Sequence, residues 1–95
     1  MSSKIQGKVE SVDASGKLIS DISNAQLDGA PRDNTLLVRF GEHETQGLFP
    51  PDHGQPDATM VASLGASGYI EIEIVGISLS DMLGIHAGEP VTIQW

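Results

Sequence analysis

Apolar residues recur at every second position along most of this sequence, and this period constrains the fold more than any other feature. In residues 69–75 three isoleucines alternate with larger polar or aromatic residues: Ile70, Ile72 and Ile74 on one side, and Tyr69, Glu71 and Glu73 on the other. Successive side chains of a β-strand point to opposite faces of the sheet. We therefore expect a strand here whose isoleucines face a core.

Further strand-like segments occupy residues 5–12, 17–22, 35–40, 43–49, 58–64 and 90–95. We expect Val38, Phe40, Val91 and Ile93 to point inward with the isoleucines. Glycine-containing turns at residues 13–16 and 65–68 and a proline-rich loop at residues 50–57 separate the strands. Residues 78–83 predict a short helix, with Ser78 or Ser80 as N-cap and Gly84 at its end.

The total is seven strands and one short helix near the C-terminus, which predicts an all-β domain. Because so little helix is available to cover a sheet, an open sheet would leave long unpaired edges. The pattern therefore favours a closed barrel or a sandwich. Neither a linker nor an internal repeat divides the 95 residues, so we expect one domain spanning residues 1–95.

The chain carries 13 acidic and 5 basic residues, for a formal net charge of −8. A nucleic-acid partner requires clustered positive charge, so we expect none. The chain has 0 cysteines, which excludes disulfides and thiolate metal sites. No apolar stretch has the length of a membrane span, so we expect a cytoplasmic protein without a membrane partner. A chain this short gains from added burial, which makes a homo-oligomer a reasonable expectation.

Histidine, glutamate and serine residues could serve as metal ligands or catalytic groups, but their spacing along the sequence does not favour these roles. The histidines His43, His53 and His86 lie too far apart for a local zinc motif, and we expect His53 to be a solvated loop residue. Glu71 and Glu73 share a strand face as an acid/base pair would, but alternating Ile and Glu is also typical of a half-exposed strand, which we favour. Ser15, Ser67, Ser78 and Ser80 fit turn and cap positions. We expect no catalytic residue, no metal and no cofactor.

Several motifs occur in the order found in one enzyme family. They are Gly7-Lys8-Val9 with residues 10–22, Gln46-Gly47-Leu48-Phe49, Thr59-Met60-Val61-Ala62, Ala66-Ser67-Gly68-Tyr69-Ile70-Glu71-Ile72 and residues 80–91. Together they resemble the C-terminal domain of the S-adenosylmethionine hydroxide adenosyltransferases, relatives of the fluorinating and chlorinating enzymes. The resemblance spans almost the whole chain and implies a single seven-stranded Greek-key-type β-barrel.

The resemblance also implies that catalysis and ligand binding depend on two different domains. In this family the catalytic residues come from a larger N-terminal α/β domain, and the barrel completes the adenine end of the pocket across a subunit interface. We expect a stand-alone chain without that α/β domain. Ser15 and Lys17 replace the family's Phe and Asn, and Asp52 lies near a lost aromatic residue. The ligand-binding positions carried over by resemblance are Ser15, Lys17, Asp52, Ser67, Gly68 and Tyr69.

These observations predict a non-catalytic binding or assembly module that does not bind S-adenosylmethionine in isolation. The alternative is a subunit of a split adenosyltransferase, completed by a separately encoded N-terminal domain. A third hypothesis is a metabolite binder that uses the turns at residues 15–17 and 65–69. For association with a second copy or another protein, we expect an exposed apolar group formed by Leu48, Phe49, Pro50, Pro51 and Tyr69.

Overall fold

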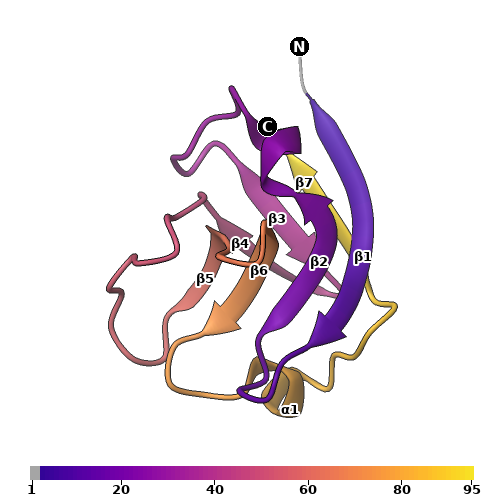
Figure 1. Cartoon of the computed structure of the whole chain (residues 1–95), viewed down its shortest axis with the longest axis vertical. Coiled ribbons are helices and arrows are strands. Elements are labelled where there is room, and N and C mark those ends of the chain that lie inside the picture. Colours follow the sequence, from indigo (N-terminus) through magenta and orange to yellow (C-terminus); the bar gives the residue numbers. More distant parts are fainter. Residues whose placement is uncertain (1–2) are drawn as a thin grey trace.

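Seven antiparallel strands form a nearly closed barrel, with one short α-helix near the C-terminus (Figure 1). The computed structural model describes residues 3–95. The strands are β1 (Lys4–Val12), β2 (Leu18–Ser23), β3 (Leu37–Phe40), β4 (His43–Gln46), β5 (Met60–Leu64), β6 (Tyr69–Ile74) and β7 (Pro90–Gln94). Their order around the sheet is β4-β3-β7-β1-β2-β6-β5. The all-β barrel expected from the sequence is thus confirmed.

The long strand β1 joins the two halves of the barrel. Its first residues pair with β7, from Lys4 opposite Gln94 to Lys8 opposite Pro90, and its later residues pair with β2. Gly7 of β1 lies close to Asp21 and Ile22 of β2. A side chain at position 7 would collide with Asp21 and Ile22, so glycine permits this close approach.

The barrel closes between its two edge strands, β4 and β5, through a few contacts instead of a full ladder. The Thr45 hydroxyl donates to the Met60 carbonyl at 3.3 Å. Beyond β4, Phe49 forms a parallel bridge with Ser63, in which the Phe49 N–H donates to Ala62 and the Leu64 N–H donates to Phe49. These contacts cover part of the edges that an open sheet would expose.

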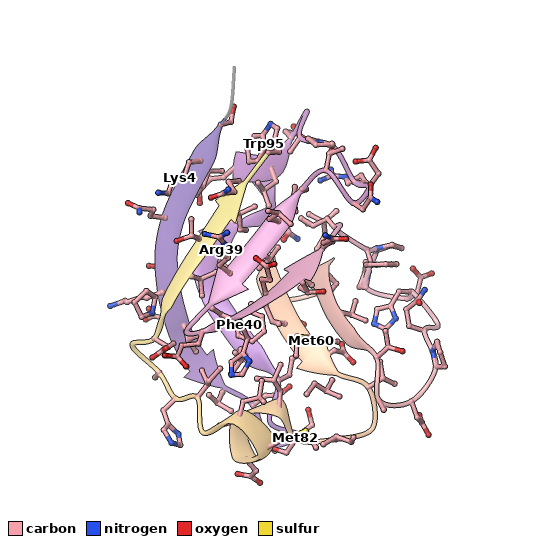
Figure 2. All side chains as sticks on the ribbon, turned by 180° about the vertical axis from the view of Figure 1, so that it is seen from behind. Lys4, Arg39, Phe40, Met60, Met82 and Trp95 are labelled. Atoms are coloured by element: carbon pink, nitrogen blue, oxygen red, sulfur yellow. The ribbon has the colours of Figure 1, made fainter. Side chains whose placement is uncertain are left out.

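The core fills the barrel interior, and the residues expected to point inward do so. Val38, Phe40, Ile70, Ile72, Ile74, Val91 and Ile93 are all buried. Further buried residues include Leu18, Ile22, Leu36, Leu48, Val61 and Leu79. Figure 2 shows side chains around the whole barrel, with Lys4 and Trp95 near one end and Met82 at the other.

The helix α1 (Leu79–Leu83) lies at the Met82 end of the barrel. As predicted, Ser78 is its N-cap and accepts a hydrogen bond from the Asp81 N–H, while Gly84 ends it in a left-handed conformation. A 3₁₀ helix at Asn24–Leu27, absent from the sequence prediction, follows β2 and buries Leu27. Within residues 3–95, no helix combines the length and apolarity needed to cross a membrane.

Three strands, β3, β4 and β5, are at least two residues shorter than predicted. A strand was expected over residues 35–40, but β3 begins at Leu37. Residues 43–49 were expected to form one strand, but β4 ends at Gln46 because Gly47 turns the chain with a φ of 82°. Residues 58–64 were also expected to form one strand, yet β5 begins at Met60. Ala58 has a φ of 69°, a left-handed conformation that an extended strand excludes.

Candidate functional site

The turn between β1 and β2 places the first residues of the candidate site. One oxygen of Asp13, Oδ1, accepts hydrogen bonds from the Ser15 N–H at 2.9 Å, the Ser15 hydroxyl at 2.7 Å and the Lys17 N–H at 2.9 Å. Burial alone would raise the pKa of Asp13, but these bonds to Ser15 and Lys17 outweigh it and hold that pKa below its ordinary value. The turn is therefore fixed by its own aspartate and delivers Lys17 to the start of β2.

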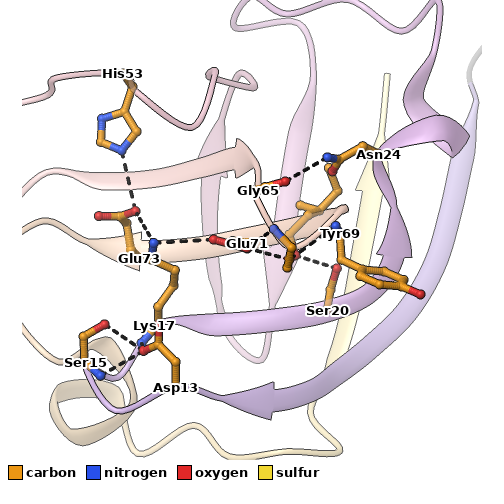
Figure 3. Close-up of polar contacts among 12 residues, drawn as sticks. Asp13, Ser15, Lys17, Ser20, Asn24, His53, Gly65, Tyr69, Glu71 and Glu73 are labelled. Atoms are coloured by element: carbon orange, nitrogen blue, oxygen red, sulfur yellow. Dashed lines mark hydrogen bonds and ion pairs between the residues drawn. The ribbon is translucent and has the colours of Figure 1, made fainter.

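Lys17 joins two carboxylates of the neighbouring strand β6. Its ammonium Nζ lies 3.4 Å from Glu71 Oε1 and 3.4 Å from Glu73 Oε2 (Figure 3). Burial lowers the pKa of Lys17, but the Glu73 and Glu71 carboxylates attract its charged form more strongly, so the pKa is raised. Two like charges on one strand face are thus neutralised in part by one cation between them.

Glu71 is buried, which corrects the expectation of a half-exposed face on β6. Its side chain is 9% exposed, and its Oε2 accepts hydrogen bonds from the Ser67 hydroxyl at 2.6 Å and the Ser67 N–H at 3.3 Å. Gly65 packs against the same carboxyl group, and a methyl group at that position would overlap it. Glu71 therefore ties the turn between β5 and β6 to Lys17.

The side chain of His53 is also buried, so the assignment of His53 as a solvated loop residue was wrong. Its side chain is 8% exposed, and its Nε2 lies 3.6 Å from Glu73 Oε2. Its Nδ1 accepts a hydrogen bond from the Gln55 N–H at 3.0 Å, and its ring meets the Phe49 ring edge-on. The proline-rich loop is thereby held over the outer face of β6. We call Lys17, Glu71, Glu73 and His53 the ionic network.

A cavity of about 290 Å³ borders this network at the end of the barrel near α1. Its lining combines the polar residues Ser15, Lys17, Glu73 and Ser78 with Ile74, Gly76 and Ile77. The two hydroxyl groups already have partners, since Ser15 donates to Asp13 and Ser78 accepts from Asp81. The cavity is suited to a small ligand that combines an apolar surface with a polar edge.

The structure brings together some of the predicted ligand positions and separates others. Ser15 and Lys17 line the cavity, and Ser67 reaches Lys17 through Glu71. Gly68 lies in the turn between β5 and β6, next to Ser67. Its carbonyl accepts a hydrogen bond from the Asn24 N–H. Asp52 is exposed in the loop. The Tyr69 ring points away from the network, as Figure 3 shows.

Only some residues of the predicted apolar interface lie at the surface. Leu48 is 4% exposed and belongs to the core, so it contributes nothing to a surface, which corrects that assignment. Phe49 is half-buried against His53, and Pro50 and Pro51 are exposed beside it. Among residues 3–95 no three His, Asp or Glu side chains gather as metal ligands would.

Comparisons with known proteins show the fold. Over 93% of its length the chain is similar to the crystal structure of an uncharacterized conserved protein from Thermotoga maritima, with a TM-score of 0.76 and 20% sequence identity, and it covers 34% of that chain. A conserved hypothetical protein from Thermus thermophilus gives a TM-score of 0.70 and 22% identity over 93% of this chain and 32% of its own. No family model and no curated protein matches the sequence. The chain thus shares its barrel with about a third of each of these two longer proteins.

Proposed function

We propose that this chain is a non-catalytic binding or assembly module, related to the C-terminal domain of the S-adenosylmethionine hydroxide adenosyltransferases. The observation that carries the proposal is the mutual engagement of the polar side chains at the candidate site. Lys17 contacts both carboxylates of β6, the Ser67 hydroxyl donates to Glu71, and the Nδ1 atom of His53 accepts from Gln55. A nucleophile or general base needs a group directed at substrate, whereas these groups are directed at one another.

The size of the cavity supports the same proposal. Sites for drug-sized ligands usually measure about 300–1,000 Å³. The cavity beside Lys17 has about 290 Å³, which is small for a nucleoside joined to an amino acid. A larger ligand would therefore need a second wall from another domain or subunit.

A split adenosyltransferase is the alternative. The barrel corresponds to 34% and 32% of two longer chains, so in those proteins it is joined to further sequence. In a split enzyme, the barrel and the further sequence would be two separate chains that associate. The barrel would then contribute its outer surface, and the partner would supply the reacting groups.

Titration calorimetry with S-adenosylmethionine separates these proposals. For the protein alone we expect a dissociation constant weaker than about 1 µM, because about −8 kcal/mol exceeds what the few free groups can supply. We also expect no adenosine, the product of adenosyl transfer to hydroxide, in a parallel chromatographic assay. Tighter binding or adenosine release by the protein alone would overturn the non-catalytic proposal. Adenosine release only after mixing with a separate α/β domain of the family would establish the split enzyme.

A further inference from the structure

A second groove lies on the outer face of β1, β2 and β6, next to the ionic network, since Ile19 of the groove lies opposite Glu71. It measures about 420 Å³ and is lined by Glu10, Ser11, Ile19, Ser20, Asp21 and Tyr69. Tyr69 is 43% exposed, whereas Phe40 is fully buried and Phe49 is half-buried. An aromatic ring and two carboxylates therefore share one open groove.

A β-bulge brings Glu10 to this groove. Val9 pairs with Ser20 and Ser11 pairs with Ile19, so Glu10 is the extra residue of β1 opposite β2. A bulge interrupts strict alternation and redirects a side chain. As a result Glu10 and Ser11, although consecutive, are both exposed and both line the groove.

The backbone of β1 holds the carboxylate of Asp21 in place. Its Oδ1 accepts a hydrogen bond from the Lys8 N–H at 2.9 Å, and the missing side chain of Gly7 leaves room for this contact. Its other oxygen, Oδ2, accepts no hydrogen bond from residues 3–95. The backbone of β1 thus fixes one carboxylate of β2 at the groove.

The two carboxylates have no cationic partner within the described chain. Lys17, Arg39 and His53 form the ion pairs found in residues 3–95, and neither Glu10 nor Asp21 takes part. Lys8 lies on the same strand as Glu10, but its ammonium pairs with neither carboxylate. The groove therefore has an excess of negative charge beside an exposed aromatic face.

From this combination we infer that the groove binds an arginine side chain of a partner protein. A guanidinium group is planar, stacks on an aromatic ring and donates hydrogen bonds to carboxylates in a fork. The Tyr69 ring offers the stacking face, Ile19 offers an apolar contact for the methylene groups, and Glu10 and Asp21 accept the hydrogen bonds. The inference rests on the proposed function as a binding module and specifies the chemistry of its partner.

The experiment uses the whole protein and the tripeptide Gly-Arg-Gly, followed by amide chemical shifts in nuclear magnetic resonance spectra. We expect saturable shifts at Glu10, Ser11, Ile19 and Tyr69, and none with the isosteric uncharged peptide Gly-citrulline-Gly. Tyr69→Leu is expected to weaken binding about five-fold, as loss of a cation–π contact of roughly 1 kcal/mol implies. Glu10→Gln, which preserves shape, is expected to weaken it by a similar factor.

Glu42→Gln is the matched control, because it removes the same charge from an exposed hairpin residue outside the groove. It should bind the peptide as the wild type does. Equal affinity in Tyr69→Leu, or shifts of similar size with the citrulline peptide, would overturn the inference. A protein that associates with a partner or itself yet ignores the arginine peptide would refute this inference alone and leave the proposed function standing.

Discussion

Lys17 holds the two carboxylates of β6 together, and its charge gives stability a dependence on pH. Its pKa is raised in the folded protein because Glu73 and Glu71 outweigh the effect of burial. A raised pKa means that the stabilisation is complete below the ordinary value of 10.5 and is lost as the pH rises through the folded value. We expect Lys17→Met to lower the free energy of unfolding by about 1–3 kcal/mol at neutral pH.

Urea denaturation of the wild type and Lys17→Met across a range of pH tests this expectation. The difference between the two proteins should be constant from neutral pH up to about pH 10 and should shrink above the ordinary lysine pKa of 10.5. Lys8→Met is a suitable control, since Lys8 forms no ion pair within residues 3–95. If the difference stays constant through the alkaline range, the charge of Lys17 is not what stabilises the fold.

The sequence predicted single residues well where burial follows the strand period and poorly where it follows contacts between strands. Ile70, Ile72 and Ile74 were assigned to the core from alternation alone. Glu71 lies on the opposite face, and its burial arises from Lys17 and Ser67, which the β1–β2 and β5–β6 connections supply. Those contacts depend on the register of β2 against β6, in which Leu18 lies opposite Ile72. A single sequence gives no direct information on that register.

At the level of the strand, Ile72 provides a direct test of the inward face of β6. It is fully buried and lies between Leu18 of β2 and Ala62 of β5. We expect Ile72→Ala to reduce the free energy of unfolding by about 2–5 kcal/mol, because both transfer energy and packing are lost. Ile77→Ala removes the same atoms from a residue that is 38% exposed and should cost less than about 1 kcal/mol. Equal losses in urea denaturation would contradict the assignment of faces.

Strand ends were predicted less well than strands because single backbone conformations determine them. Gly47 ends β4 and Ala58 delays β5, both through positive φ angles. Glycine often signals such a turn, but alanine adopts this conformation rarely, so nothing in the local sequence indicated it. The 3₁₀ helix at Asn24–Leu27 was missed for a related reason, since four residues are too few for a helical period to be visible.

For the molecule as a whole, the strand count and the need to hide edges were enough to predict a barrel or a sandwich. The choice between them depends on the seam between β4 and β5, where Thr45 meets Met60 and Phe49 meets Ser63. These residues are far apart in the sequence and share no pattern. The prediction of a barrel instead of a sandwich came from the resemblance to a barrel domain, and the structure confirms the barrel.

Self-association of the molecule remains a prediction. The apolar surface available for it is smaller than the sequence predicted. Phe49, Pro50 and Pro51 form the retained apolar group, since Leu48 is buried and Tyr69 lies in the other groove. A net charge of −8 opposes self-approach at low salt, whereas an apolar contact depends little on salt. We expect sedimentation equilibrium at high micromolar concentration to show dimers or larger species that persist from low to high salt.

Two variants locate the contact. Replacing Pro50 and Pro51 by serine should weaken self-association at least about ten-fold if the loop beside Phe49 forms the interface, since about 1.4 kcal/mol corresponds to that factor. Met82→Ser removes a residue that is 59% exposed on α1 and should leave association unchanged. The reverse outcome would move the interface to α1. A protein that stays monomeric in both salts would leave no self-association to locate, and the module would then require a different chain as its partner.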